Sequence, residues 1–265
     1  MIEHNASWNL QAPTTSGDSP NFFSGLSGLV LPIPKYKFPP EHQNASRLTY
    51  YATIFNSIEI NRSFYKIPLN KTINKWAYSV GDDFKFTFKL FKGITHEKNL
   101  QFDNLLIEQF MEAVSHVGAK KGCLLLQFPP SLKNDNLHQL ERLLQALRTL
   151  DPVENWTIAV EFRNKSWYND DVYDMLGTYK SLLVVQDIPT SATPLVNQLC
   201  HGVYIRFHGP TGNYRGTYTD AFLMEYAEYV RAWLKEGKTV YLYFNNTMGN
   251  AFQNLATLKN LVVSP

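Results

Sequence analysis

Six charged side chains lie in or directly after short apolar runs of this sequence, and their types and spacing suit catalysis. They are Glu59, Lys89, Glu161, Arg163, Asp187 and Arg206. Two carboxylates that face each other, Glu59 and Glu161, can serve as general acid and as base or nucleophile, as in glycoside hydrolysis. Arg206 and Lys89 can instead bind a phosphate or carboxylate, the first as a two-pronged donor and the second as a point charge.

Two other interpretations of these residues stay open. Glu59, Glu161, Asp187 and His208 could hold one or two divalent ions for metal-assisted hydrolysis. We rank this lower and assign no metal ligand, because the sequence has no HExxH or other compact ligand motif. The cofactor is left open. The charges could also form a structural network without chemistry, since buried charges are costly unless they are paired.

Eight runs rich in β-branched and aromatic residues must position these side chains. The expected strands are 22–28, 57–64, 84–90, 123–128, 157–163, 182–187, 203–208 and 239–245. Amphipathic segments alternate with them, the clearest being 136–150 and 220–237, the latter with Asp220 as expected N-cap and Gly237 as the stop. This alternation predicts a single-domain α/β fold, a TIM-type (β/α)8 barrel. A doubly wound open sheet is the alternative, but "SGLSGL" is only a weak match to its phosphate-binding turn.

Side chains alternate between the two faces of a strand, so each run can be divided into outward and inward positions. In 157–163, Ile158 and Val160 then pack against the outer helices, while Glu161 and Arg163 face the barrel interior. The inward polar positions of the other strands are Glu59, Asn61, Lys89, Gln127, Asp187, Arg206, His208, Tyr243 and Asn245. Because the C-terminal ends of barrel strands converge on the active site, these residues form the candidate site.

The loops that follow the strands add further candidates. His96 in "GITHEK" is a possible acid or base, and aromatic residues beyond two strands can contact a ring-bearing ligand. We expect catalytic roles for Glu59, Lys89, Glu161, Asp187, Arg206 and His208. We expect substrate binding by Asn61, His96, Gln127, Arg163, Trp167, Tyr214, Tyr218, Tyr243 and Asn245.

Composition narrows the classes of function. The chain has 265 residues, a formal net charge of +2 and no run of Lys or Arg. This charge pattern argues against nucleic acid as a partner, so we expect a small-molecule ligand or substrate. No apolar stretch is long enough to span a bilayer, and the two cysteines, Cys123 and Cys200, are too few for a disulfide framework. We therefore expect a cytoplasmic protein with a flexible leader over 1–20 and a barrel domain over 21–265, and leave its oligomeric state open.

Six stretches of the sequence resemble the successive motifs of the DUF72, or YecE-like, family. They are "FNSIEINRSFYKIP", "FKFTFKLFKGITH", "LLLQFPPSL", "AVEFRNKSWY", "YIRFHG" and "YLYFNNT". The resemblance implies a TIM-type barrel and leaves the activity unassigned. It marks most of the residues above as motif positions and adds Tyr65 to the expected substrate-binding residues.

Two hypotheses follow from these observations. The first is a hydrolase that acts on a small polar or anionic ring-bearing substrate, with Glu59 and Glu161 as acid and base and with Arg206 and Lys89 stabilising charge. The second is a barrel that binds a small ligand for sensing or sequestration without turnover. Fold alone does not decide between them. Under the first, Glu161→Gln abolishes turnover and leaves stability nearly intact.

Overall fold

The computed structural model describes residues 19–195 and 201–263. Its strands are β1 (Phe22–Leu26), β2 (Ser57–Ile60), β3 (Lys85–Lys89), β4 (Lys121–Gln127), β5 (Thr157–Glu161), β6 (Ser181–Gln186), β7 (Gly202–Phe207) and β8 (Thr239–Phe244). Its α-helices are α1 (Arg47–Tyr51), α2 (Asn70–Tyr78), α3 (Lys92–Thr95), α4 (Asn104–Ser115), α5 (Leu137–Leu150), α6 (Asp170–Thr178), α7 (Asp220–Lys235) and α8 (Ala251–Val263). Short 3-10 helices are η2 (Lys35–Lys37), η3 (Pro40–His42), η4 (Asn61–Phe64), η5 (Lys98–Leu100), η6 (Gly118–Lys120), η7 (Asn134–Asn136) and η8 (Lys165–Trp167).

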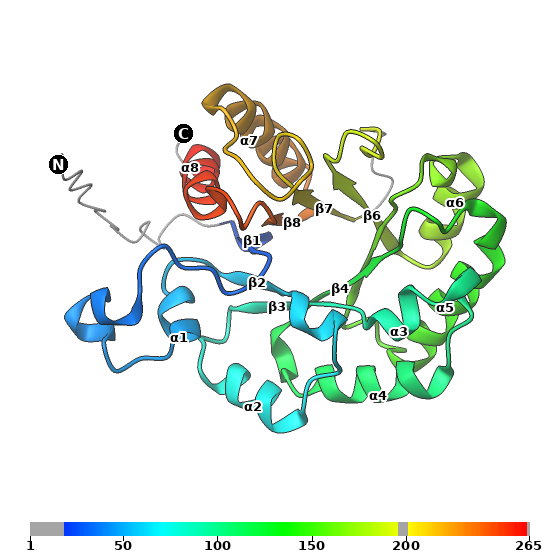
Figure 1. Cartoon of the computed structure of the whole chain (residues 1–265), viewed down its shortest axis with the longest axis horizontal. Coiled ribbons are helices and arrows are strands. Elements are labelled where there is room, and N and C mark those ends of the chain that lie inside the picture. Colours follow the sequence, from blue (N-terminus) through cyan, green and yellow to red (C-terminus); the bar gives the residue numbers. More distant parts are fainter. Residues whose placement is uncertain (1–18, 196–200, 264–265) are drawn as a thin grey trace.

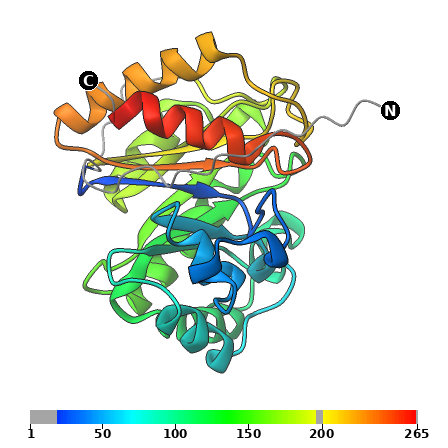
Figure 2. The same ribbon diagram turned by 90° about the vertical axis from the view of Figure 1, so that its left-hand side faces the viewer.

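All the strand pairs are parallel, and the strands follow one another around a nearly closed barrel in the order β1-β8-β7-β6-β5-β4-β3-β2. The helices lie outside the strands, with α7 and α8 packed beside each other over β8 (Figures 1 and 2). The predicted TIM-type barrel is therefore confirmed, and the open-sheet alternative is excluded.

Side chains close the seam between β1 and β2, where the only backbone pairing in the described residues is a single bridge from Ser27 to Glu59. The Tyr51 hydroxyl accepts from the Leu26 N–H at 2.8 Å and donates to the Ser57 carbonyl at 2.9 Å. These contacts satisfy buried backbone groups that a regular ladder would otherwise pair.

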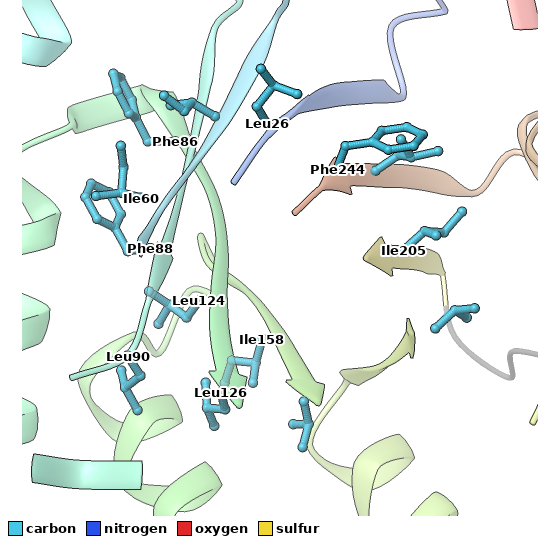
Figure 3. Packing of buried hydrophobic residues seen from close by; sticks show 14 of the residues in the cluster. Leu26, Ile60, Phe86, Phe88, Leu90, Leu124, Leu126, Ile158, Ile205 and Phe244 are labelled. Carbon is cyan, nitrogen blue, oxygen red and sulfur yellow. The ribbon is translucent and has the colours of Figure 1, made fainter. Parts of the chain in front are cut away.

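The side chains of the strands pack in two layers, one outside and one inside the barrel, and lie on the strand faces that we expected. The outward residues form one large apolar core with the helices, and ten of them are labelled in Figure 3, where they point away from the barrel axis. A smaller cluster fills the interior: Cys123, Leu125, Ala159, Leu182, Val184, Tyr204, Tyr241 and Tyr243. The inward positions therefore carry an apolar and tyrosine-rich base, with the polar residues above it.

The helix predictions are confirmed with one correction. Helix α5 buries Leu140, Leu143, Leu144 and Leu147 at helical spacing. Helix α7 is capped by Thr219, whose side chain accepts from the Phe222 N–H, and not by Asp220. Asp220 lies in the first turn, where its charge interacts favourably with the helix dipole. Gly237 adopts φ +78° directly after the helix, as expected of a C-terminal stop.

The strand expected over 57–64 is shorter than predicted. It ends at Ile60, and η4 follows. The turn is held by the Ser63 hydroxyl, which lies 2.7 Å from both the Ile60 and the Lys89 carbonyl oxygens. Asn61 therefore stands at the barrel rim at the start of a helical turn and not in a strand.

Some sequence predictions concern residues outside the described ranges. Nearly all of the expected leader lies there, as does Cys200, while Cys123 is buried with a free thiol. No helix in residues 19–195 and 201–263 has the length and apolar character needed to cross a membrane.

Candidate functional site

Arg206 is the centre of the polar cluster above the interior tyrosines. It stands near the C-terminal end of β7, is 2% exposed, and bridges two fully buried carboxylates. Its Nε donates to both Glu59 oxygens at 3.1 and 3.0 Å, and its Nη2 donates to Glu59 Oε1 at 2.8 Å. Its Nη1 donates to Glu161 Oε2 at 3.1 Å. The guanidinium thus compensates charges from opposite sides of the barrel, which isolated buried carboxylates require.

Glu59 has both oxygens occupied. The Tyr204 hydroxyl donates to Oε2 at 2.6 Å, in addition to the Arg206 contacts. Burial acts to raise the Glu59 pKa, but the Arg206 charge and the hydrogen bonds outweigh it and hold the pKa below its usual value. Glu59 is therefore a fixed carboxylate that orients Arg206. Tyr204 was not predicted as part of the site, although it lies two residues before Arg206 on the same strand face.

Glu161 has one oxygen with spare capacity. Its Oε1 forms an ion pair with Arg163 Nη2 but has no partner in hydrogen-bond geometry, and its side chain is fully buried. Burial opposes ionisation, but the charges of Arg163 and Arg206 hold the Glu161 pKa far below its usual value. Arg163 Nε also has no hydrogen-bond partner within the described residues. Arg163 Nε and Glu161 Oε1, which also lies 3.6 Å from His208 Nε2, are therefore the atoms of this part of the site that keep capacity for a further hydrogen bond.

His208 is a neutral imidazole of defined tautomer. Its Nε2 lies 2.9 Å from Arg163 Nη2 and 3.0 Å from Arg206 Nη1, and guanidinium groups only donate. Nε2 is therefore the acceptor, and Nδ1 carries the hydrogen toward Asp187 Oδ1 at 3.3 Å. Burial lowers the His208 pKa, although the Glu161 charge and the Asp187 contact act in the opposite direction.

Asp187 and Tyr218 fix the far side of His208. Asp187 Oδ1 also accepts from the His208 backbone N–H at 2.8 Å, while the Tyr218 hydroxyl donates to Oδ2. That hydroxyl accepts from the Gly209 N–H at 2.6 Å, so its proton is directed at the carboxylate. Tyr218 is 4% exposed and therefore supports Asp187 from within the protein.

Lys89 extends the cluster toward β3 and β4. Its Nζ donates to Gln127 Oε1 at 2.8 Å and lies 4.1 Å from the centre of the Phe64 ring. Burial, and next the charge of Arg206, lowers the Lys89 pKa to about 8. His96 contacts the same ring at 4.8 Å, and burial with the Lys89 charge lowers its pKa to about 4. At neutral pH, Lys89 is mainly a cation and His96 is neutral.

Comparison with known proteins identifies the family. Residues 31–264 match the family described as "Protein of unknown function DUF72". The chain belongs to the DUF72 family. This confirms the resemblance seen in the sequence motifs.

Relatives of this DUF72 protein are known in sequence and structure. It is 24% identical to the UPF0759 protein YunF of Bacillus subtilis over 80% of this chain and 84% of that protein. It is 27% identical to the UPF0759 protein YecE of Escherichia coli K12 over 45% and 44% of the two chains. The crystal structure of a DUF72 protein from Enterococcus faecalis superposes with a TM-score of 0.74 at 20% identity, over 92% of this chain and 98% of that one. A DUF72 crystal structure from Thermotoga maritima superposes with a TM-score of 0.72 at 24% identity, over 91% of this chain and 98% of that one. The structural matches support the fold alone.

The rim of the DUF72 barrel carries most of the expected binding residues. Asn61 Oδ1 accepts from Arg206 Nη2 at 3.4 Å, and Asn245 is 7% exposed at the end of β8. The Tyr214 ring lies 5.7 Å from the His208 ring and is 37% exposed. Tyr65 is 69% exposed and contacts Phe64. Two accessible rings therefore flank the charged centre.

Like Tyr218, whose ring packs in the outer core against Phe207 and Phe222, two further residues expected to bind substrate lie away from the rim. Trp167 is fully buried, stacks on Phe162 at 4.7 Å, and donates from Nε1 to the Leu132 carbonyl at 2.8 Å, so it belongs to the outer core. The Tyr243 hydroxyl lies 2.6 and 2.7 Å from the Ser57 and Thr87 hydroxyls, deeper in the interior. Both residues lie away from the rim because large rings fill two layers of the barrel. Trp167 packs between the strands and the helices, and Tyr243 lies in the interior beneath the charged side chains.

The carboxylates of the DUF72 site are already paired with other groups. Glu59 and Glu161 contact guanidinium groups, and Asp187 contacts His208 and Tyr218. Among residues 19–195 and 201–263, no group of three or more His, Cys, Asp or Glu side chains is arranged to hold a metal ion. This arrangement gives the metal-assisted alternative no support.

Proposed function

We propose that this DUF72 protein is a hydrolase that acts on a small anionic substrate at the C-terminal mouth of its barrel. His208 serves as the general base, oriented by Asp187. Arg163 and Lys89 bind the anionic group, and Arg206 stabilises negative charge that develops in the reaction. The observation that carries this proposal is the position of His208 Nε2, an unprotonated nitrogen between two guanidinium groups.

The His208 geometry fits a base that removes a proton from water. Asp187 holds Nδ1–H, so the proton taken up by Nε2 produces an imidazolium stabilised by the adjacent carboxylate. In the ligand-free arrangement, Nε2 accepts from Arg163 and Arg206. A substrate anion that engages Arg163 removes one of these contacts and frees the nitrogen for water.

The cations favour an anionic substrate. Within the part of the chain that the structure describes, Arg163 Nε has no hydrogen-bond partner and Lys89 Nζ contacts only neutral groups. An anion at these two residues gains charge-assisted hydrogen bonds without breaking the Glu59–Arg206 contact. The exposed rings of Tyr65 and Tyr214 favour a substrate with a planar ring.

This assignment changes the roles expected from the sequence. Glu59 accepts hydrogen bonds on both oxygens and is fully buried, so we propose a positioning role for it in place of acid–base catalysis. Glu161 keeps one unsatisfied oxygen and remains a candidate contact for a substrate hydroxyl or for the attacking water.

The test combines a binding measurement with a turnover measurement. Inorganic phosphate should raise the melting temperature, and a panel of p-nitrophenyl esters should yield activity on phosphate or carboxylate-bearing members but not on neutral ones. His208→Asn should lower that turnover by about 10²- to 10⁴-fold and keep the phosphate effect. His116→Asn, at an exposed ion pair with Glu112, is the control and should change neither. The hydrolase proposal fails if no ester is cleaved faster by the protein than by the His208 variant.

A binding protein without turnover is the second candidate. The observation in its favour is that the carboxylates expected to do chemistry are compensated by Arg163 and Arg206. Phosphate stabilisation that is lost in Arg163→Gln, together with no cleavage of any panel ester, would favour this candidate.

A further inference from the structure

Lys89 differs from the other two cations of the site in its surroundings. Arg163 and Arg206 each contact a carboxylate, whereas no carboxylate of the described residues lies within ion-pair distance of Lys89 Nζ. The side chain is half-buried and stands at the C-terminal end of β3. We infer that Lys89 is an amine nucleophile that forms an imine with the carbonyl group of an aldehyde or ketone bound at the proposed anion site. This inference rests on the proposed function for the choice of an anionic ligand.

Gln127 places Lys89 in a geometry suited to this chemistry. The Gln127 Nε2 donates to the Phe128 carbonyl at 2.7 Å, so Oε1 is the atom that faces Lys89. A neutral amine can donate one hydrogen to Oε1 and keep its lone pair directed elsewhere. The ring of Phe64 covers another side of Nζ and limits its hydration. The nitrogen is therefore held in place without being tied to a carboxylate.

The electrostatics act in the same direction. Burial, and next the charge of Arg206, disfavour the cationic form of Lys89 and outweigh the opposing charges of Glu161 and Glu59, so that the Lys89 pKa falls to about 8. A pKa about 2.5 units below the ordinary value increases the neutral fraction near pH 7 by about 300-fold. Lysines activated in this way are the ones that form Schiff bases in enzymes.

The reaction balances without an oxidant or reductant. The neutral amine adds to the carbonyl carbon to form a C–N bond, and one amine proton moves to the carbonyl oxygen to give a carbinolamine. Loss of that oxygen as water, with a second proton, gives the imine.

The experiment uses two aromatic aldehydes that differ in charge. The full chain is incubated at pH 8 with 4-carboxybenzaldehyde or 4-methylbenzaldehyde and sodium cyanoborohydride, and modified lysines are mapped by peptide mass spectrometry. Lys85 is the internal control, because it stands at the other end of β3 and donates to the Ala119 carbonyl. Lys89 should be labelled by the carboxylated aldehyde about tenfold or more faster than Lys85, with a rate that rises through pH 8.

Two variants separate the possible outcomes. Lys89→Arg should remove this label, while Lys85→Arg should retain both the label and the stabilisation by phosphate. Equal labelling of Lys85 and Lys89 overturns the imine inference, even if phosphate still binds. Rapid labelling of Lys89 by both aldehydes supports the amine chemistry and overturns the anion site on which the proposed function depends.

Discussion

At the scale of single residues, burial and partners separate side chains that look equivalent in the sequence. Glu59 and Glu161 are both fully buried carboxylates beside Arg206, but only Glu59 has both oxygens in hydrogen bonds. Glu59 therefore serves to hold Arg206 in place, and a change at this position acts first on the fold.

Glu59→Gln tests this difference. The variant leaves the buried Arg206 charge with one carboxylate in place of two, so the free energy of unfolding should fall by about 3 kcal/mol or more, measured by urea denaturation. The control is Glu154→Gln, which disrupts an exposed ion pair with Lys180 and should have no measurable effect. A stable Glu59→Gln protein that lost only turnover would restore Glu59 as an acid–base candidate.

At the scale of elements, closure of the barrel depends on side chains of the segment that joins β1 to β2. Tyr51, at the end of α1, links the Leu26 N–H to the Ser57 carbonyl, and the Asn56 side chain contacts the Ser24 N–H and the Phe22 carbonyl. These contacts bring β1 beside β2, so that Glu59 faces the same interior as Arg206.

Tyr51→Phe tests the seam. The substitution keeps the ring but leaves two buried backbone groups without a partner, which should cost about 1–3 kcal/mol of stability. Hydrogen exchange at the Leu26 amide should accelerate more than exchange in β4 or β5. The control is Tyr50→Phe at the neighbouring residue. It removes a hydroxyl that makes no hydrogen bond within the described residues and should leave both measurements unchanged. Uniform acceleration across the barrel would argue against a local role for Tyr51.

At the scale of the whole molecule, the barrel divides its large rings between two environments. Rings of the outer layer, such as Trp167 and Phe162, pack between strands and helices. Rings of the inner cluster, such as Tyr204 and Tyr243, support the charged centre from below. We therefore expect stability and the proposed ligand binding to depend on different sets of aromatic residues.

Trp167→Ala tests this division. Loss of the buried ring and of its hydrogen bond to the Leu132 carbonyl should lower the free energy of unfolding by about 3–5 kcal/mol. Stabilisation by phosphate, measured below the melting temperature of the variant, should persist because Trp167 does not line the mouth. Tyr78→Ala, at a ring that is 89% exposed, is the control for stability. Loss of phosphate binding in a folded Trp167 variant would place this residue in the site after all.

The sequence by itself determined that eight strands alternate with helices and on which face most strand residues lie. Alternation with period 2 separates Glu161 from Ile158 and Val160, and this pattern depends only on local backbone geometry. The same reasoning placed Tyr204, Arg206 and His208 inward, although it did not include Tyr204 in the candidate site. Helical periodicity likewise identified the buried leucines of α5.

Only the tertiary structure decided which of these residues are paired and which retain free capacity. The Arg206–Glu59 contact joins residues 147 positions apart, and the Tyr243–Ser57 contact joins residues 186 positions apart. Such distances depend on barrel closure and on how far each strand extends, as the turn after Ile60 shows. Burial and neighbouring charges then set the pKa of Lys89, and the contacts with Arg163 and Arg206 set the tautomer of His208, because both depend on what the fold brings within a few ångströms.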